Sequence, residues 1–158
     1  MRFLLVLVVA LPALLAGCSK SPSTEAPVAE RPQLTVYKSP TCGCCAKWMD
    51  HANAHGLATE LKSEQDMTVV QKRLGVPEGL YSCHVATAGD YLIVGHVPAE
   101  DVQRLLREKP KAKGLAVRGM PIGSPGMEHG DHQQAYDTLM FQADGQTSVF
   151  ARHAGNNP

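Results

Sequence analysis

Three cysteines within four residues constrain this chain more than any other feature. Cys42, Cys44 and Cys45 directly follow residues 34–38, whose alternating apolar side chains predict a short strand. The Ser-Pro-Thr stretch at residues 39–41 ends that strand and opens a predicted helix. A helix N-terminus lowers the pKa of a thiol and favours the thiolate, the form that attacks disulfides and binds soft metals. The sequence therefore predicts redox chemistry, thiophilic metal binding, or both.

The N-terminal residues predict export and attachment to a membrane. An apolar stretch, residues 3–16, is too short for a confident membrane-spanning helix and is typical of a secretory signal. It ends in Leu15-Ala16-Gly17-Cys18, which resembles the lipobox of bacterial lipoproteins. The resemblance implies removal of residues 1–17, lipidation of Cys18 and a location in the periplasm. Because Ser19 and not Asp follows, an outer-membrane anchor is favoured; the alternative is a plain secreted protein.

The rest of the chain divides into a tether and one predicted domain. Residues 18–32 mix proline with Ser, Thr, Glu and Ala, which predicts a flexible tether. Residues 33–158 are enough chain for one compact domain. The formal net charge is zero and no basic block stands out, so no nucleic-acid partner is expected. No phosphate-binding loop, Ser-His-Asp set or carboxylate pair supports a kinase or hydrolase.

The cysteine count favours a working site over a structural staple. Of five cysteines, lipidation of Cys18 would leave Cys42, Cys44, Cys45 and Cys83. Exported thiols normally become structural disulfides. A bond that closes a loop of a few residues removes little entropy from the unfolded chain, so the crowded cysteines are a poor stabilising staple.

The pattern of apolar residues predicts an α/β fold. The expected strands are residues 34–38, 57–62, 84–87, 91–94, 138–142 and 147–151, and the expected helices are residues 42–55, 66–74 and one starting at Pro98. The 66–74 helix is expected to bury Val69, Val70 and Leu74 on one stripe, and residues 114–130 read as a Gly/Pro-rich stretch. A strand followed at once by a Cys-bearing helix start is typical of a thioredoxin-like arrangement. We expect a thioredoxin-like mixed sheet with flanking helices and a C-terminal β-hairpin extension.

Several stretches spread over nearly the whole mature chain match one known pattern: residues 36–45 with Lys47-Trp48, 82–84, 95–99, 114–117, 119–128, 136–137 and 151–153. In these stretches the chain resembles the CopG-type copper-resistance proteins, a family of exported thioredoxin-fold proteins long carried as a domain of unknown function. The resemblance implies copper binding at the cysteine cluster and a role in handling excess periplasmic copper. Expected partners are copper ions and other periplasmic copper-handling proteins.

Two uses of the same sulfur atoms stay open. Soft thiolates select Cu(I), with zinc the weaker option, and Cys42, Cys44, Cys45 and Cys83 together could hold a multinuclear Cu(I) cluster. Alternatively, Cys42 and Cys45 have the C-x-x-C spacing of catalytic cysteines in thiol–disulfide oxidoreductases. Oxidation would release bound metal, which links the two uses. An enzyme that couples Cu(I)/Cu(II) change to thiol chemistry and a non-catalytic copper chaperone are both compatible with the pattern.

Four further residues are weighed as ligands near the cysteines. His84 is the favoured nitrogen ligand because it follows Cys83, in the loop expected to face the cysteine helix. His96 is a candidate ligand or a turn-capping residue. Met120 is a candidate thioether ligand, whereas Met127 is favoured as a gap-filling side chain.

Two histidine pairs stand apart from the cysteines. His51 and His55 are four residues apart on the first predicted helix, a spacing that suits a surface metal ion, although a solvated helix face is favoured. His51 lies about 10 Å along the helix from Cys44, too far to share its metal. His129 and His132 are expected to lie in a plain polar loop.

Overall fold

The structure, a computed structural model, describes residues 31–156. The predicted signal peptide, Cys18 and nearly all of the predicted tether lie outside this range. Within it, no helix has both the length and the apolar character that a membrane crossing requires. The described chain begins its first strand at Gln33 and ends its last at His153.

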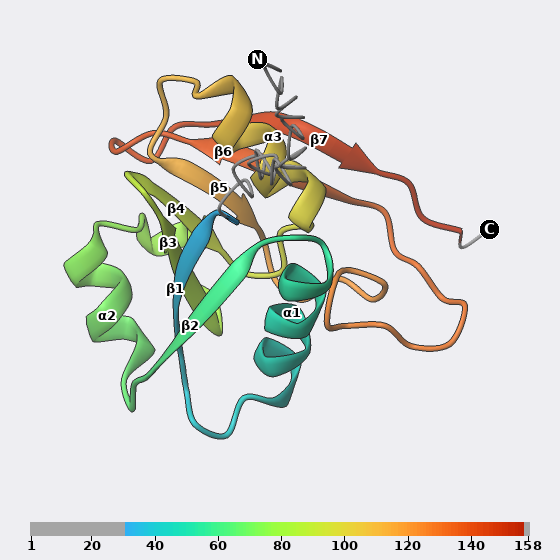
Figure 1. The fold of residues 1–158 in the computed structure, drawn as a ribbon. Helices are drawn as coiled ribbons and strands as arrows, with labels where there is room; N and C mark the ends of the chain where they lie inside the picture. The colour runs from blue at the N-terminus through green and yellow to red at the C-terminus, as the bar shows by residue number, and fades with distance from the viewer. Residues whose placement is uncertain (1–30, 157–158) are drawn as a thin grey trace, which may run out of the picture.

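One seven-stranded mixed sheet organises the described residues, in the order β2-β1-β3-β4-β5-β6-β7 (Figure 1). The strands are β1 (Gln33–Lys38), β2 (Ala58–Ser63), β3 (His84–Ala88), β4 (Tyr91–Val94), β5 (Gly114–Val117), β6 (Tyr136–Phe141) and β7 (Thr147–His153). The pairs β1/β2 and β4/β5 are parallel, and the other neighbours are antiparallel. The predicted mixed α/β architecture is confirmed, and the order β2-β1-β3-β4 is compatible with a thioredoxin-like arrangement.

Helices cover both faces of the sheet. They are α1 (Gly43–Ala54), α2 (Met67–Leu74) and α3 (Ala99–Glu108), with a short 3-10 helix, η1 (Glu78–Leu80). Alternate side chains of each strand point to opposite faces, which creates two apolar cores. One core joins α1 and α3 to the sheet around Trp48, and the other joins α2 and η1 to the opposite face around Phe141 (Figure 1).

Helix α2 starts as predicted but buries a different stripe. The Asp66 side chain accepts hydrogen bonds from the backbone N–H groups of Thr68 and Val69 and caps the helix. Val70 is buried, whereas Val69 is 58% exposed, so the expected burial of Val69 is wrong. Adjacent helical residues point about 100° apart, so Val69 and Val70 cannot both face the sheet.

The main departure from the predicted elements is β5, which lies in the stretch expected to be only Gly/Pro-rich. Its four residues are all buried, between β4 and β6. A short strand buried on both faces has no polar alternation, the pattern by which strands are recognised in a sequence.

The predicted C-terminal hairpin is confirmed as β6 and β7, which extend the sheet beyond β5. His153 of β7 lies with Nε2 2.9 Å from a carboxylate oxygen of Asp101, which ties the hairpin to α3.

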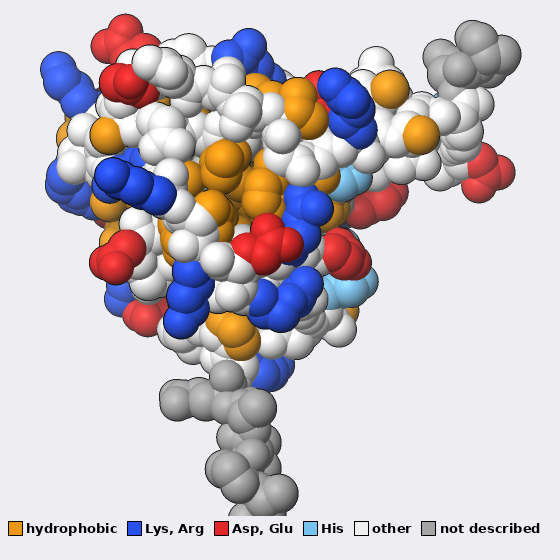
Figure 2. Space-filling model, turned by 90° about the horizontal axis from the view of Figure 1, so that it is seen from above, with side chains coloured by type: hydrophobic (Ala, Val, Ile, Leu, Met, Phe, Trp, Pro, Cys, Tyr) orange, Lys and Arg blue, Asp and Glu red, His pale blue; other side chains and the backbone are white. Residues whose placement is uncertain are grey.

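On the face seen in Figure 2, Lys and Arg side chains are interspersed with Asp and Glu rather than gathered into a block of one sign.

Candidate metal centre

Strand pairing brings the two cysteine segments together. The last residue of β1, Lys38, pairs with the first residue of β3, His84, in the antiparallel register. The chain that leaves β1 towards Cys42 and the residue that precedes β3, Cys83, therefore meet at the same end of the sheet. Cys42 caps α1, and its sulfur accepts the backbone N–H of Cys45 at 3.3 Å.

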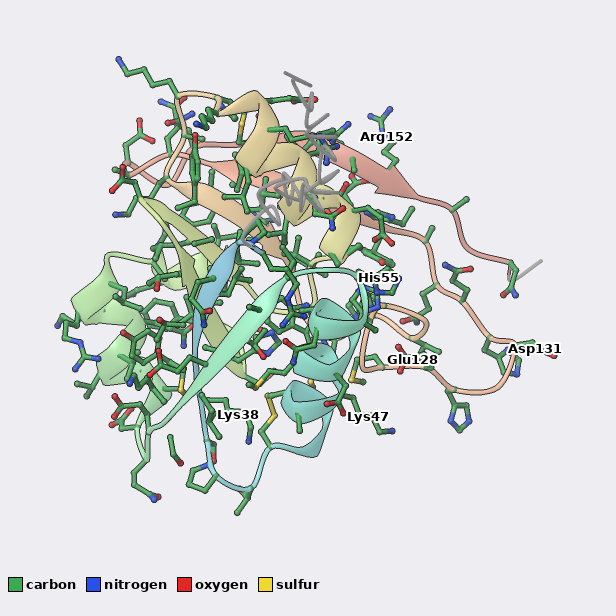
Figure 3. All side chains as sticks on the ribbon, viewed as in Figure 1. Lys38, Lys47, His55, Glu128, Asp131 and Arg152 are labelled. Carbon is green, nitrogen blue, oxygen red and sulfur yellow. A yellow bond between two sulfur atoms is a disulfide. The ribbon has the colours of Figure 1, made fainter. Side chains whose placement is uncertain are left out.

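Four sulfur atoms converge at the N-terminal end of α1. The Sγ atoms of Cys42, Cys44, Cys45 and Cys83 all lie within 4.8 Å of one another. Cys42 and Cys45 form a disulfide, visible as the yellow bond in Figure 3, whereas Cys44 and Cys83 are free thiols. The Cys44 sulfur lies 3.4 Å from that of Cys42. Cys45 is fully buried and the other three are partly exposed, so solvent reaches the centre from their side.

A second ligand group shares Cys83 with the first. The Cys83 sulfur lies 3.4 Å from Nδ1 of His84 and 3.5 Å from Nε2 of His96. The three ligand atoms lie within 4.8 Å of one another, and both imidazoles are fully buried. Cys83 therefore stands between a sulfur-rich group and a nitrogen-rich group.

The orientation of His96 is fixed by a backbone carbonyl. Its Nδ1 donates to the oxygen of Pro125 at 2.8 Å, which leaves the lone pair of Nε2 directed at Cys83. Burial lowers the pKa of His96, against the opposing effects of the Pro125 carbonyl and Glu128. A neutral imidazole with one nitrogen held by a carbonyl is the usual arrangement of a metal-binding histidine.

His84 carries an unpartnered nitrogen in the core. Its ring lies 4.7 Å from that of Trp48, and among the described residues its Nε2 has no hydrogen-bond partner. Burial, with His96 next in size, lowers the pKa of His84 to about 3, so the ring is neutral. Leaving a buried polar atom unpaired costs free energy, and such atoms are rare in native proteins. The other ring nitrogen, Nδ1, lies 3.4 Å from the Cys83 sulfur, so a neutral His84 fits a metal held together with Cys83 and His96.

Burial has the opposite effect on the remaining thiol. It raises the pKa of Cys83, and the neighbouring Cys44 raises it further. Cys83 is therefore a neutral thiol until a cation lies beside it, because a bound cation favours the thiolate.

A Pro/Gly loop closes over the centre. A Cβ atom on Gly126, whose φ is +85°, would lie 2.6 Å from the carbonyl oxygen of Cys44 and 2.9 Å from the backbone nitrogen of Trp48. Only glycine permits that approach and that backbone conformation. The same loop supplies the Pro125 carbonyl to His96, so one segment fixes both the cysteine turn and an imidazole.

The two methionines of this loop region have different surroundings. Met127 lines a hollow of about 510 Å³ together with Cys44, Lys47, Glu128 and His129. Met120 is 53% exposed and lines a separate hollow with Arg118 and Tyr136. Met127 thus lines the hollow that Cys44 also lines, whereas Met120, the sequence candidate, lines a different one.

Two further residues at the centre were not singled out by the sequence. Pro125 acts through its carbonyl, which no side-chain pattern reveals. Lys38 is only 5% exposed and donates to the Ser39 carbonyl at 2.8 Å, which places a buried ammonium group across from His84. The only available signal was that both residues lie in the stretches of family resemblance.

Fold and site together define an α/β protein with a cysteine–histidine metal-binding centre. Residues 80–127 match a family described as "Protein of unknown function, DUF411". The comparison with curated protein sequences gives no match.

Two solved structures, "Copper resistance protein copG" in Form 1 and Form 2, are each 43% identical to this chain. Form 1 has a TM-score of 0.75 and its alignment covers 80% of this chain and 100% of that one. For Form 2 the TM-score is 0.73 and the shares are 77% and 98%. The chain belongs to the CopG-like copper-resistance family.

Proposed function

We propose that this protein binds copper at the cysteine–histidine centre and serves copper resistance. The observation that carries the proposal is the convergence of four cysteine sulfurs and two buried imidazoles, in a chain 43% identical to proteins named for copper resistance. Sulfur ligands favour Cu(I), and imidazoles accept both Cu(I) and Cu(II). Cysteine and histidine also bind zinc, so the choice of copper rests on the likeness to the copper-resistance proteins.

The proposed ligands divide by chemistry. Cys42, Cys44, Cys45 and Cys83, once reduced, supply thiolates that bridge several Cu(I) ions. His84 and His96 supply nitrogen on the other side of Cys83. Met127, which lines the same hollow as Cys44, is the proposed thioether ligand, the role for which the sequence offered Met120 as a candidate.

Thiol oxidation gives the centre a means to change the oxidation state of its copper. When Cys42 and Cys45 form their disulfide, two thiols lose two protons and two electrons. Those two electrons reduce two Cu(II) ions to two Cu(I) ions. Cys44 and Cys83 keep their sulfurs available to bind the product. Repeated turnover needs an external dithiol that reduces the disulfide; without one, the protein sequesters copper or passes it on as a chaperone.

One observation favours a second candidate function, thiol–disulfide exchange with other proteins. Cys42 and Cys45 form a disulfide across the C-x-x-C spacing, with Cys42 partly exposed and Cys45 buried. In that case Cys42 would be the reactive thiol, and loss of Cys44 or His84 would have little effect on activity.

The proposed location is the periplasmic side of the outer membrane, through lipid on Cys18. The support is the sequence at residues 15–18. Replacement Cys18→Ala should move the protein from the membrane fraction to the soluble fraction of cells. An unchanged membrane fraction would contradict the anchor without touching the copper proposal.

Metal loading of the mature full-length protein tests the function. The protein is solubilised in detergent, reduced, loaded with Cu(I) in the absence of oxygen, and analysed for metal per chain. Parallel loading with Zn(II) is the comparison. Several Cu(I) ions per chain that survive a competing chelator support a thiolate cluster. Loss of all copper, with a freely cycling dithiol, favours disulfide exchange instead.

A further inference from the structure

We propose that His51, His55 and Glu100 form a second metal site, at the C-terminal end of α1, that takes Cu(II). This site stands independently of the proposed sulfur-bound copper. One ligand atom from each of the three side chains lies within 4.8 Å of the other two. His51 and His55 share a face of α1, with ring centroids 4.2 Å apart, and Glu100 comes from the first turn of α3. The sequence supplied the histidine pair, and the packing of α3 against α1 supplies the carboxylate.

The hydrogen bonds of His55 prepare it for a cation. Its Nδ1 donates to the backbone carbonyl of His51 at 2.8 Å, which fixes the tautomer and leaves a lone pair on Nε2. That Nε2 lies 3.5 Å from a carboxylate oxygen of Glu100. Two electron-pair donors therefore face each other across a gap that a cation would bridge. A ring held by a carbonyl on one side and free on the other is the common arrangement of metal-binding histidines.

His51 has a competing role. It is half-buried, and its Nε2 accepts the backbone N–H of Ala99 at 3.2 Å, at the start of α3, where Pro98 offers no side-chain cap. Coordination through this nitrogen exchanges that long hydrogen bond for a metal–nitrogen bond. Burial and the neighbouring His55 lower the pKa of His51, so the ring is neutral and its lone pair is available.

The charge around the site suits a divalent cation. The negative charges of the Glu100 and Glu128 carboxylates both act to raise the pKa of His51, against the larger effects of burial and His55. Figure 3 shows His55 at the C-terminal end of α1 and Glu128 on the loop beside this helix. Two imidazoles and a carboxylate form a borderline donor set without sulfur, for which Cu(II) has the highest affinity of the common divalent ions. Imidazoles also accept Cu(I), but the carboxylate and the lack of sulfur make this set favour Cu(II), so the two ends of α1 would differ in preferred oxidation state.

The test uses Cu(II) alone and a protein whose thiols cannot compete. The full-length protein keeps its Cys42–Cys45 disulfide, and its free thiols are blocked with iodoacetamide. We expect one saturable Cu(II) per chain, with an electron paramagnetic resonance spectrum that shows coupling to two imidazole nitrogens. His55→Ala should weaken binding at least tenfold and remove one nitrogen from the spectrum. Glu100→Gln should weaken binding by a smaller factor.

His55→Ala is preferred over a His51 variant because His55 is exposed and does not cap α3. His132→Ala, at an exposed histidine on a separate loop, is the matched control and should bind Cu(II) like the parent. Equal binding by His55→Ala and the parent would overturn the proposal, as would loss of binding only in His132→Ala. The number of Cu(I) ions bound by reduced, unblocked His55→Ala should equal that of the parent, which separates this site from the sulfur centre.

Discussion

Helix α1 has a different donor set at each end, and the contrast shows two ways of building a site. At the N-terminal end, sulfur and imidazole converge in a partly buried centre whose parts are fixed by the backbone of a covering loop. At the C-terminal end, two imidazoles on successive turns meet a carboxylate at a largely exposed surface. The first site has soft sulfur ligands held in fixed positions. The second has nitrogen and oxygen ligands, which are harder, on an exposed surface. We expect the ends to differ in oxidation-state preference and in sensitivity to mutation.

The largest expected effect comes from Cys44→Ser. Oxygen replaces a sulfur that lies within 4.8 Å of three others, so a bridging ligand of the proposed cluster is lost. We expect loss of most thiolate-bound Cu(I), measured as copper per chain and as ultraviolet thiolate-to-copper absorption. Cys18→Ser makes the same substitution away from the centre and should retain the copper. If Cys44→Ser binds copper like the parent, the cluster interpretation fails.

A smaller loss is expected for His84→Ala. Removal of a nitrogen ligand should weaken copper binding by roughly 10- to 100-fold and alter the absorption spectrum while sulfur ligands remain. The ring is fully buried beside Trp48, so its removal leaves a cavity and should lower the unfolding temperature while unfolding stays cooperative. Chelator competition measures the affinity. An unchanged spectrum and affinity would remove His84 from the ligand set and leave the nitrogen role to His96.

The contrast between the two ends of α1 also explains which parts of the site could be predicted from the sequence. Cys42, Cys44 and Cys45 are contiguous, so their convergence needs only a helix start. The position of Cys83 followed from the expected strand order, which the pairing of Lys38 with His84 bears out.

Other features depend on packing that no local pattern encodes. Glu100 meets His51 across 49 positions of sequence, and the choice between Met120 and Met127 is decided by the path of a loop held down at Gly126. Strand β5 was missed for the same reason, because its apolar residues carry a helix-or-strand ambiguity that only their neighbours resolve.

Acid should lower the free energy of unfolding of the metal-free protein, through His84 at the N-terminal end of α1. His84 is neutral in the folded protein, with a pKa of about 3, whereas the unfolded chain gains a proton below about pH 6.5. The contribution of neutral His84 to the free energy of unfolding is therefore fully present above pH 6.5. It falls as the pH drops towards 3, by up to about 1.4 kcal/mol per pH unit. Denaturant unfolding at pH 7 and pH 5 measures the slope. His84→Gln should flatten it, and an equal slope in both proteins would assign the effect to other groups.

The smallest expected effect comes from Met127→Leu, which tests whether the soft ligands of the centre include a thioether as well as the cysteines. Met127→Leu replaces a thioether by an apolar side chain of similar volume, in the hollow that also contains Cys44. We expect Cu(I) affinity to fall several-fold, or transfer from a Cu(I) chelate to slow, with no change in thermal stability. Met120→Leu is the matched control, because Met120 is exposed in a separate hollow. If the two variants bind Cu(I) alike, Met127 is not a ligand and the cysteines are the only soft ligands among the described residues. A deficit confined to Met127→Leu would extend that set to the surface, where incoming copper first meets the protein.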